Sequence, residues 1–249
     1  MKILQVNTLS GAGGAALVAA NLSEAYRAAG CQSWLLAGPQ TRPGPDVFAA
    51  PRRSALSALQ GRLDAWLGRE DFNFPSTDRI LDLPPGRPDI VQCHNLHGGY
   101  FDLRALPALC AQAPVVLTLH DAWLLAGHCA HSLDCERWET GCGSCPYPDI
   151  YPAVRRDMTA YNWKRKKRIY SNSRLYAAAP SAWLLGRLRR SMLAPALAGA
   201  KVIPNGIDLS VFHPADRRQA RESLGLPPDA DILLFAAQGG RNNPWKDYP

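Results

Sequence analysis

The chain has 249 residues, of which 47% are hydrophobic and 20% charged, a composition that fits a globular protein with one large domain and part of another. No run of about eighteen apolar residues occurs, which argues against a membrane-spanning helix, and the opening MKILQVN is too short for a signal peptide. We therefore expect a cytoplasmic protein, and the formal net charge of +7 predicts an anionic partner such as a phosphorylated substrate, a membrane surface or nucleic acid.

Strand-like and helix-like stretches alternate along the chain. Apolar, strand-like runs are predicted at residues 3–6, 33–36, 89–93, 115–119, 175–179, 201–203 and 231–236. Helices are predicted between most of them, at 14–29, 54–68, 102–112, 153–168 and 182–192, whereas 39–53 and 84–88 are rich in Pro, Gly and Arg and predict loops. This alternation predicts an α/β fold, a Rossmann-like parallel sheet flanked by helices.

The last part of the chain departs from this alternation. A polar segment follows the sixth predicted strand and leads into one further strand-like run, after which no helix is predicted. We therefore expect residues 1–204 to form one domain, and 205–249 to form a linker and the first strand of an incomplete second domain. On this interpretation the chain is the N-terminal part of a longer protein.

A glycine-rich turn follows the first predicted strand. Gly11, Gly13 and Gly14 permit a tight turn, and the helix after them points its N-terminal amides outward, which suits a phosphate or diphosphate group. The spacing differs from the dinucleotide-binding fingerprint, and no acidic residue follows the second strand. A turn needed only for packing between strand and helix therefore remains an alternative.

Polar and aromatic residues follow the third and fourth predicted strands. The sequences concerned are CHNLHGGY and LHDAW, which supply His94, Asn95, His97, Tyr100, His120, Asp121 and Trp123. Because the carboxyl ends of parallel strands meet at one edge of a sheet, these side chains are expected to converge on one cleft. His120 beside Asp121 suits a proton shuttle or a group that orients a hydroxyl. The alternative is that one or two of the histidines only cap loop backbone.

Four cysteines cluster after the fourth strand, with the spacing C-x5-C-x6-C-x2-C: Cys129, Cys135, Cys142 and Cys145. Four thiolates would satisfy a structural, tetrahedral zinc ion, with His128 or His131 as a substitute ligand. Free thiols packed around Trp138 are one alternative, and disulfides or a redox role are another, although a reducing cytoplasm disfavours disulfides. The remaining cysteines, at 31, 93 and 110, are predicted to be small core residues.

A basic segment spans residues 155–168 on a predicted helix. Its cations are Arg155, Arg156, Lys164, Arg165, Lys166, Lys167 and Arg168, against the single acid Asp157. With the neighbouring aromatic residues Tyr161 and Trp163, it predicts contact with an anionic membrane surface, or else a solvated helix face. Combined with the cysteine cluster it also allows a zinc-containing nucleic-acid-binding module, but no known nucleic-acid-binding signature occurs.

Several motifs together resemble one family. They are SGAGGAALVAANLSEAYRAAG, PDIVQCHNLHGGYFDL, VVLTLHDAW, APSAWLLGRLRRS and VIPNGIDLSVFHP leading into ILLFAAQGGRNNPWKDYP. On these motifs the chain resembles the N-terminal half of family 4 glycosyltransferases, which have the two-domain GT-B fold. The cysteine stretch after LHDAW is similar to the branch that builds extracellular polysaccharides of the colanic-acid type.

The resemblance implies a retaining glycosyltransferase of the hexosyltransferase type. It would move a sugar from a nucleotide-diphosphate sugar to a saccharide or lipid-linked acceptor, with no metal at the diphosphate. Gly13 and Gly14 would face the donor phosphates, Lys246 matches the family's phosphate-binding lysine, and His120 would lie beside the transferred sugar. Arg241 does not align with the companion arginine.

The resemblance also has gaps. The family's paired glutamates would lie beyond Pro249, so the isolated chain is not expected to turn over. A GT-B sugar epimerase or phosphorylase remains a further alternative within the same fold.

Overall fold

The computed structural model describes residues 1–11 and 13–236, and it divides the chain into two compact units, 1–206 and 207–249. The first unit contains one seven-stranded sheet in the order β3-β2-β1-β4-β5-β6-β7, in which every neighbouring pair is parallel. The strands are β1 Lys2–Asn7, β2 Gln32–Ala37, β3 Val47–Ala49, β4 Ile90–Cys93, β5 Val115–Thr118, β6 Leu175–Ala179 and β7 Leu197–Val202.

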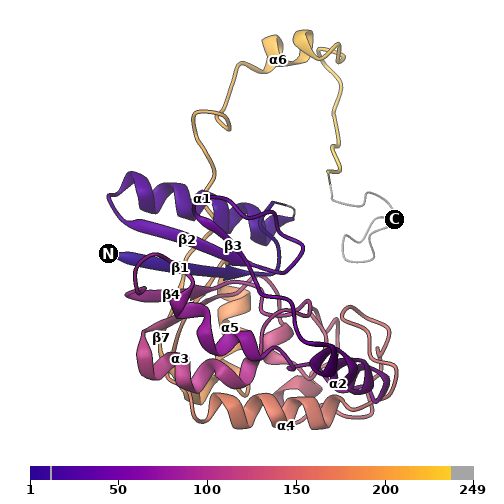
Figure 1. Cartoon of the computed structure of the whole chain (residues 1–249). Helices are drawn as coiled ribbons and strands as arrows, with labels where there is room; N and C mark the ends of the chain where they lie inside the picture. The colour runs from indigo at the N-terminus through magenta and orange to yellow at the C-terminus, as the bar shows by residue number, and fades with distance from the viewer. Residues whose placement is uncertain (12, 237–249) are drawn as a thin grey trace. The chain divides into compact units, whose positions relative to one another are not determined.

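Helices flank this sheet (Figure 1). They are α1 Gly14–Ala28, α2 Ala55–Trp66, α3 Leu106–Gln112, α4 Thr159–Tyr170 and α5 Ala182–Arg190, with short 3-10 turns that include η1 Pro75–Asp82, η2 Leu103–Ala105, η3 Trp123–Leu125, η4 Arg137–Glu139 and η5 Ala194–Ala196. The central strands are buried on both faces, which explains why they read as continuous apolar runs. The Rossmann-like parallel sheet predicted from the sequence is therefore confirmed.

The strand register places the loops that carry polar residues side by side. Val6 of β1 is level with Cys93 of β4, and Cys93 is level with Leu117 of β5. The segments that follow these three strands therefore leave the sheet at the same edge. They are the glycine turn, the loop that begins at His94 and the loop that contains His120.

In the first unit, β3 and the start of α4 differ from the sequence prediction, and β7 begins at Leu197, before the predicted 201–203. β3 lies inside the stretch predicted as a loop; it has three residues among prolines and glycines and pairs only with β2. α4 begins at Thr159 rather than near 153, because the Asp157 carboxylate accepts hydrogen bonds from the Thr159 amide and hydroxyl, at 3.1 and 2.6 Å. Such a carboxylate satisfies the free amides at a helix start.

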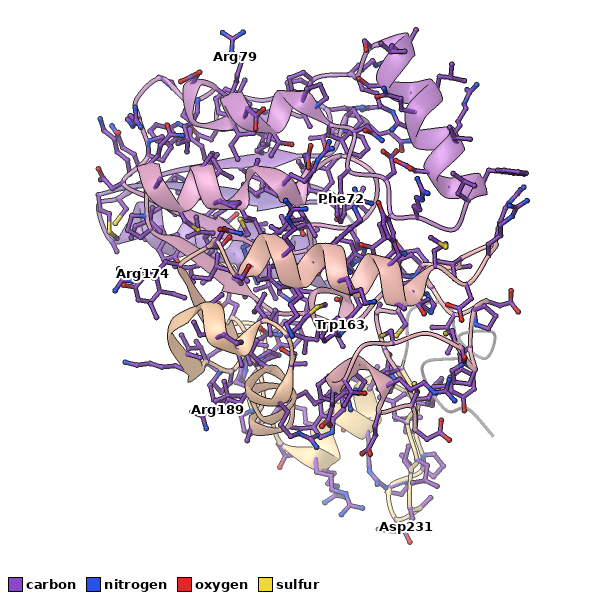
Figure 2. All side chains as sticks on the ribbon, turned by 90° about the horizontal axis from the view of Figure 1, so that it is seen from below. Phe72, Arg79, Trp163, Arg174, Arg189 and Asp231 are labelled. Carbon is purple, nitrogen blue, oxygen red and sulfur yellow. The ribbon has the colours of Figure 1, made fainter. Side chains whose placement is uncertain are left out.

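The burial of side chains follows these layers. Figure 2 shows Phe72 and Trp163 pointing into the interior, whereas Arg79, Arg174 and Arg189 project outward. No helix in residues 1–11 and 13–236 is long and apolar enough to cross a bilayer.

The second unit contains the helix α6 Arg217–Ser223, whose first turn is capped by the Asp216 carboxylate accepting from the Gln219 amide at 2.8 Å. The strand predicted at 231–236 is not formed in the structure, and Leu233 and Leu234 are exposed there. The described residues of this unit contain no strand that could pair with it, so its backbone groups have no sheet partner.

Candidate functional site

Three polar side chains form a hydrogen-bonded line at the edge where β1, β4 and β5 end. Gln5 lies on β1, His94 directly follows β4, and His120 follows β5. The Gln5 Oε1 atom lies 2.9 Å from His94 Nε2, and His94 Nδ1 lies 2.9 Å from His120 Nε2. We call this set the Gln5–His94–His120 relay.

The hydrogen bonds of Gln5, the buried end of the relay, determine which nitrogen of each histidine carries a proton. The Gln5 amide nitrogen donates to the Ala19 carbonyl at 3.0 Å and to the Ser23 hydroxyl at 2.5 Å, so the Gln5 oxygen must be the atom that faces His94. That oxygen accepts, hence His94 carries its proton on Nε2 and accepts at Nδ1. His120 in turn donates from Nε2, which leaves its Nδ1 unprotonated.

Both histidines of the relay are neutral at pH 7. Burial, and then the nearby His120, lower the pKa of His94 to about 3. Burial also lowers the pKa of His120, although Asp121 opposes this shift. His94 is only 1% exposed, whereas His120 is partly exposed, so His120 is the member that a ligand can reach.

A second pair lies beside the relay. His97 Nε2 lies 2.8 Å from the Asp121 carboxylate, whose other oxygen accepts from the Trp123 amide at 2.9 Å. The Tyr151 hydroxyl lies 3.3 Å from His97 Nδ1, and the His97 ring lies 5.5 Å from the Trp123 ring. Asp121 therefore orients His97 and the start of the Trp123 loop, and it makes no hydrogen bond to His120.

Asn95 and Tyr100 shape the loop that carries His97. The Tyr100 and Thr8 hydroxyls donate to the Asn95 carbonyl at 2.6 and 3.2 Å, and the Asn95 amide donates to Asn7 Oδ1 at 3.2 Å. The Tyr100 ring is buried and its hydroxyl is already used, so its role in the structure is to hold the loop. The structure thus brings together most of the predicted residues but gives them different tasks.

A cavity of about 190 Å³ adjoins this cluster. Its walls include Glu70, Phe72, His97, Phe101, Trp123 and His128. Aromatic faces beside a carboxylate and imidazoles are suited to a sugar, because its C–H groups pack on rings while its hydroxyls need polar partners.

Glu70 and Lys166 form a buried ion pair beside the cavity that sequence reasoning missed. Lys166 is fully buried, and its ammonium donates to the carbonyls of Trp123 and Ala126, at 2.8 and 3.0 Å. Its third contact is to Glu70 Oε1, at 2.8 Å. Burial raises the pKa of Glu70 and lowers that of Lys166, and each partner opposes the other's shift. No motif marks either residue, since Lys166 looks like one more cation of a basic run.

The glycine turn has the geometry that the sequence required. Gly13 precedes α1 with φ at +89°, a left-handed conformation that favours glycine. Among the described residues, apart from chain neighbours, no atom lies within 4 Å of a Cβ placed at Gly11, Gly13 or Gly14. Lys246, the other predicted phosphate contact, lies outside the described residues.

The cysteine cluster follows the η3 turn that carries Trp123. All seven cysteines are free, and Cys129 and Cys142 pack against the core cluster that includes Trp138. His128 donates from Nδ1 to the Pro152 carbonyl at 2.8 Å and lies 3.3 Å from the Cys145 sulfur. In the described ranges, no group of three or more His, Cys, Asp and Glu residues is arranged to hold a metal ion. Zinc at Cys129, Cys135, Cys142 and Cys145 stays a prediction, as does the alternative of free thiols packed around Trp138.

The basic segment is less uniform than its sequence indicates. Lys166 points inward, and Arg165 stacks 4.4 Å above the Phe72 ring while donating to the Glu70 carbonyl at 2.9 Å. Five cations of the segment remain exposed: Arg155, Arg156, Lys164, Lys167 and Arg168. Two of the seven predicted membrane-facing charges are therefore structural.

Comparison with known proteins identifies the family. The family model described as Glycosyltransferase Family 4 matches residues 12–211, most of the chain. The chain belongs to glycosyltransferase family 4. The predicted resemblance is thereby confirmed, and the loops of the relay and of the His97–Asp121 pair lie within the matched region.

The relatives of this family 4 chain include longer proteins. WcaC of Escherichia coli (strain K12), named as a colanic acid biosynthesis glycosyl transferase, is 28% identical over 264 residues, which cover 98% of this chain and 64% of WcaC. D-inositol 3-phosphate glycosyltransferase 1 of Catenulispora acidiphila is 61% identical over 159 residues, covering 62% of this chain and 31% of that protein. The chain thus spans about 64% of the length of WcaC.

Several solved structures also match the chain. The crystal structure of AviGT4, a glycosyltransferase involved in avilamycin A biosynthesis, aligns with a TM-score of 0.26 at 14% identity, over 82% of this chain and 64% of that one.

Proposed function

We propose that this chain is the acceptor-binding part of a retaining glycosyltransferase of extracellular polysaccharide biosynthesis. Such an enzyme would transfer a sugar from a nucleotide-diphosphate sugar to a saccharide or lipid-linked acceptor. The family match and the name of WcaC support the reaction class. The observation that carries the proposal is the convergence of two imidazole pairs beside a cavity lined by aromatic rings and a carboxylate.

In this proposal, His120 presents a neutral imidazole to the sugar. Its unprotonated Nδ1 accepts a hydrogen bond from a sugar hydroxyl, while its Nε2 is held by His94. A neutral acceptor orients a hydroxyl without placing a fixed charge beside the bond that breaks. Asp121 acts through His97, which it orients, and Trp123 supplies a wall of the acceptor cavity.

The donor diphosphate would bind at the glycine turn. The amides that follow Gly13 and Gly14 and the positive end of α1 would stabilise negative charge on the leaving group. Lys246 would add a cation, and no metal ion would be needed at the diphosphate. We expect a second domain of the GT-B type to close over this site and exclude water. The 249-residue chain alone is then expected to bind acceptor without turning over.

The partners and location follow from the same proposal. A lipid-linked acceptor would bring the protein to the inner face of the membrane as a peripheral protein. The exposed cations of residues 155–168 would contribute attraction to anionic lipids.

Saturation-transfer NMR on the 249-residue chain tests the acceptor site. Candidate oligosaccharides, lipid-linked saccharides with short chains and nucleotide sugars are added in turn, and saccharide signals are expected to respond. His120→Asn should weaken the response at least about tenfold through the lost hydroxyl contact, while Arg79→Gln, at an exposed site, should leave it unchanged. Circular dichroism melts confirm that both variants fold.

Two results would contradict the proposal. One is the absence of any saccharide response together with a nucleic-acid gel shift that persists at moderate salt. The other is release of a free sugar from a nucleotide sugar with no acceptor present, which would indicate an epimerase or phosphorylase.

A further inference from the structure

The outer face of α2 carries large apolar side chains that no part of the first unit covers. Leu56, Leu59, Leu63 and Trp66 are 66, 64, 55 and 49% exposed. Their spacing of three, four and three residues places them on one side of the helix. The same spacing in a sequence normally predicts the buried side of a helix.

Polar contacts on the opposite side explain why α2 does not turn this stripe inward. Gly61 is the only buried residue of the helix and lies against the ion pair between Arg53 and Asp71. The Asp64 carboxylate accepts from the Asn73 side-chain amide at 2.9 Å. These contacts fix the rotation of the helix, so its apolar stripe faces away from the first unit.

Cations surround the stripe. The Arg156 guanidinium lies 3.8 Å above the Trp66 ring, and Arg62 is exposed on α2 itself. Arg155 and Lys164 are exposed on the neighbouring segment, and Figure 1 shows α2 beside the end of α4. The acids Asp64, Asp71 and Asp157 near this helix are engaged: Asp64 with Asn73, Asp71 with Arg53, and Asp157 with the amides of Cys145 and Thr159.

We propose that this face docks onto an anionic bilayer. The docking face comprises Leu56, Leu59, Leu63 and Trp66, with Arg62 and Arg156 at its border. The leucines and the indole would enter the headgroup boundary, where aromatic and aliphatic groups are stable, and the arginines would contact lipid phosphates. The face lies outside the residues assigned to sugar transfer, and the inference rests on the proposed peripheral membrane location, to which it adds the apolar side chains that would enter the lipid.

Charge favours a bilayer over a second copy of the chain as the occupant. In a two-fold dimer this face would meet itself, and Arg62 and Arg156 would approach their own counterparts across an apolar contact. Like charges brought together in this way oppose association. A surface of lipid phosphates instead neutralises them.

Sedimentation with vesicles tests the proposal on the 249-residue chain. Vesicles of phosphatidylcholine alone are compared with vesicles that contain about one third phosphatidylglycerol, since anionic lipid should raise binding by cationic faces. The double variant Leu59→Gln/Leu63→Gln should lower the partition coefficient for anionic vesicles at least about tenfold, because two exposed leucines no longer enter the lipid. Arg62→Gln/Arg156→Gln should lower the preference for anionic lipid, while the other exposed cations of 155–168 keep part of it.

The matched control is Leu17→Gln, which changes an equally exposed leucine (63%) on α1 and should bind as the parent does. Equal recovery of the parent chain in the supernatant with both vesicle types would overturn the proposal. Binding that the leucine variant and the control lower equally would also overturn it. Light scattering is run in parallel, and a dimer that the leucine variant dissociates, without vesicle binding, would assign the face to self-association instead.

Discussion

Both side-chain amide hydrogens of Gln5 are donated to protein acceptors. Through His94, this fixes which nitrogen of His120 carries the proton. The order of donors and acceptors runs from the Ala19 carbonyl through Gln5 and His94 to His120. Each step allows one choice of proton position only, as long as both imidazoles are neutral. The hydrogen bonds of Gln5, a residue of β1, therefore determine that His120 presents an unprotonated Nδ1 to a ligand.

Nitrogen-15 NMR of the histidine rings checks this order. The chain has six histidines, so long-range proton–nitrogen spectra can be assigned with single-histidine variants. At pH 7 we expect His94 and His120 to carry their protons on Nε2. Gln5→Glu keeps an acceptor for His94 and should preserve the pattern, whereas Gln5→Leu removes it and should allow the other tautomer. A proton on Nδ1 of His120 in the parent chain would contradict the relay.

The low pKa of His94 predicts loss of stability in acid. Its pKa is about 3 in the folded chain, against a usual value of 6.5, so the unfolded state binds the proton more tightly. The stabilising contribution is complete above pH 6.5 and is lost as the pH falls toward 3, at about 1.4 kcal/mol per pH unit from this group.

Urea unfolding between pH 7 and pH 4 measures this slope. His94→Gln lowers stability at pH 7 through its lost contacts, but its stability should fall less steeply with acid. His213→Gln, at an exposed site, is the matched control. Parallel slopes for the parent and His94→Gln would show that His94 does not cause the acid sensitivity.

At the scale of elements, the inner face of α4 clamps the η3 turn that carries Trp123. Lys166 reaches the Trp123 and Ala126 carbonyls, and the Tyr170 hydroxyl donates to the Leu124 carbonyl at 2.9 Å. One helix thereby satisfies three carbonyls of a turn that forms a wall of the cavity. Order in the cavity wall depends on this helix.

Removing the Lys166 ammonium should therefore be costly. Lys166→Met leaves the Glu70 carboxylate buried without its cation, and we expect unfolding free energy to fall by about 3–5 kcal/mol. Adding Glu70→Gln to the same chain should restore part of the loss, because the buried charge is removed. Lys164→Met, an exposed neighbour, should change stability by no more than about 0.5 kcal/mol in urea unfolding. A small effect of Lys166→Met would show that the pair is not held as described.

Thiol alkylation and metal analysis of one sample decide whether the clustered cysteines are free thiols or zinc ligands. Burial raises the pKa of Cys129 to about 12 and that of Cys142 to about 11, so both thiols should resist alkylation at pH 8 in the native chain. After unfolding, all seven cysteines should react. Metal analysis accompanies the alkylation. One zinc per chain, removed by a chelator together with the protection, would show instead that the thiolates bind metal.

Local pattern was enough to predict six of the seven strands of the sheet, most helices and the edge at which the relay forms, but it missed β3 and predicted a strand at 231–236 that is not formed. Hydrophobic runs identify buried parallel strands, and parallel strands end at a common edge. The pairing within the site was not accessible, because contacts such as those between Gln5 and His94 join residues far apart in sequence. Asp121 was expected to serve His120, its neighbour in the chain, but it bonds to His97 instead.

The sequence also did not predict which side of α2 packs against the rest of the first unit. The spacing of Leu56, Leu59, Leu63 and Trp66 predicts one apolar side, but not whether that side is covered. Contacts to Arg53, Asp71 and Asn73 decide it, and these residues belong to other segments. For the same reason Lys166 could not be separated from the exposed cations beside it.

At the scale of the whole molecule, residues 1–206 contain all seven strands of the sheet. A chain that ends at Gly206 should therefore fold by itself, and its Tm should lie within about 3 °C of that of the full chain. Differential scanning calorimetry makes the comparison, and the vesicle assay can be repeated on the shortened chain. A large drop in Tm would show that 207–249 stabilises the sheet unit.

The order of strands in the sheet also bears on synthesis of the protein at the ribosome. β1 is the first strand made and lies between β2 and β4, with Ile3 level with Ile90. After β2 has been made, one long side of β1 has no partner until more than fifty further residues have been added, about 3–10 s at ordinary elongation rates of ~5–20 residues per second. During that interval β1 exposes a row of free amides and carbonyls, the kind of surface that recruits other chains. Folding yield in the cell should therefore depend on the pace at which the first ninety or so residues emerge, and on chaperones that shield them meanwhile.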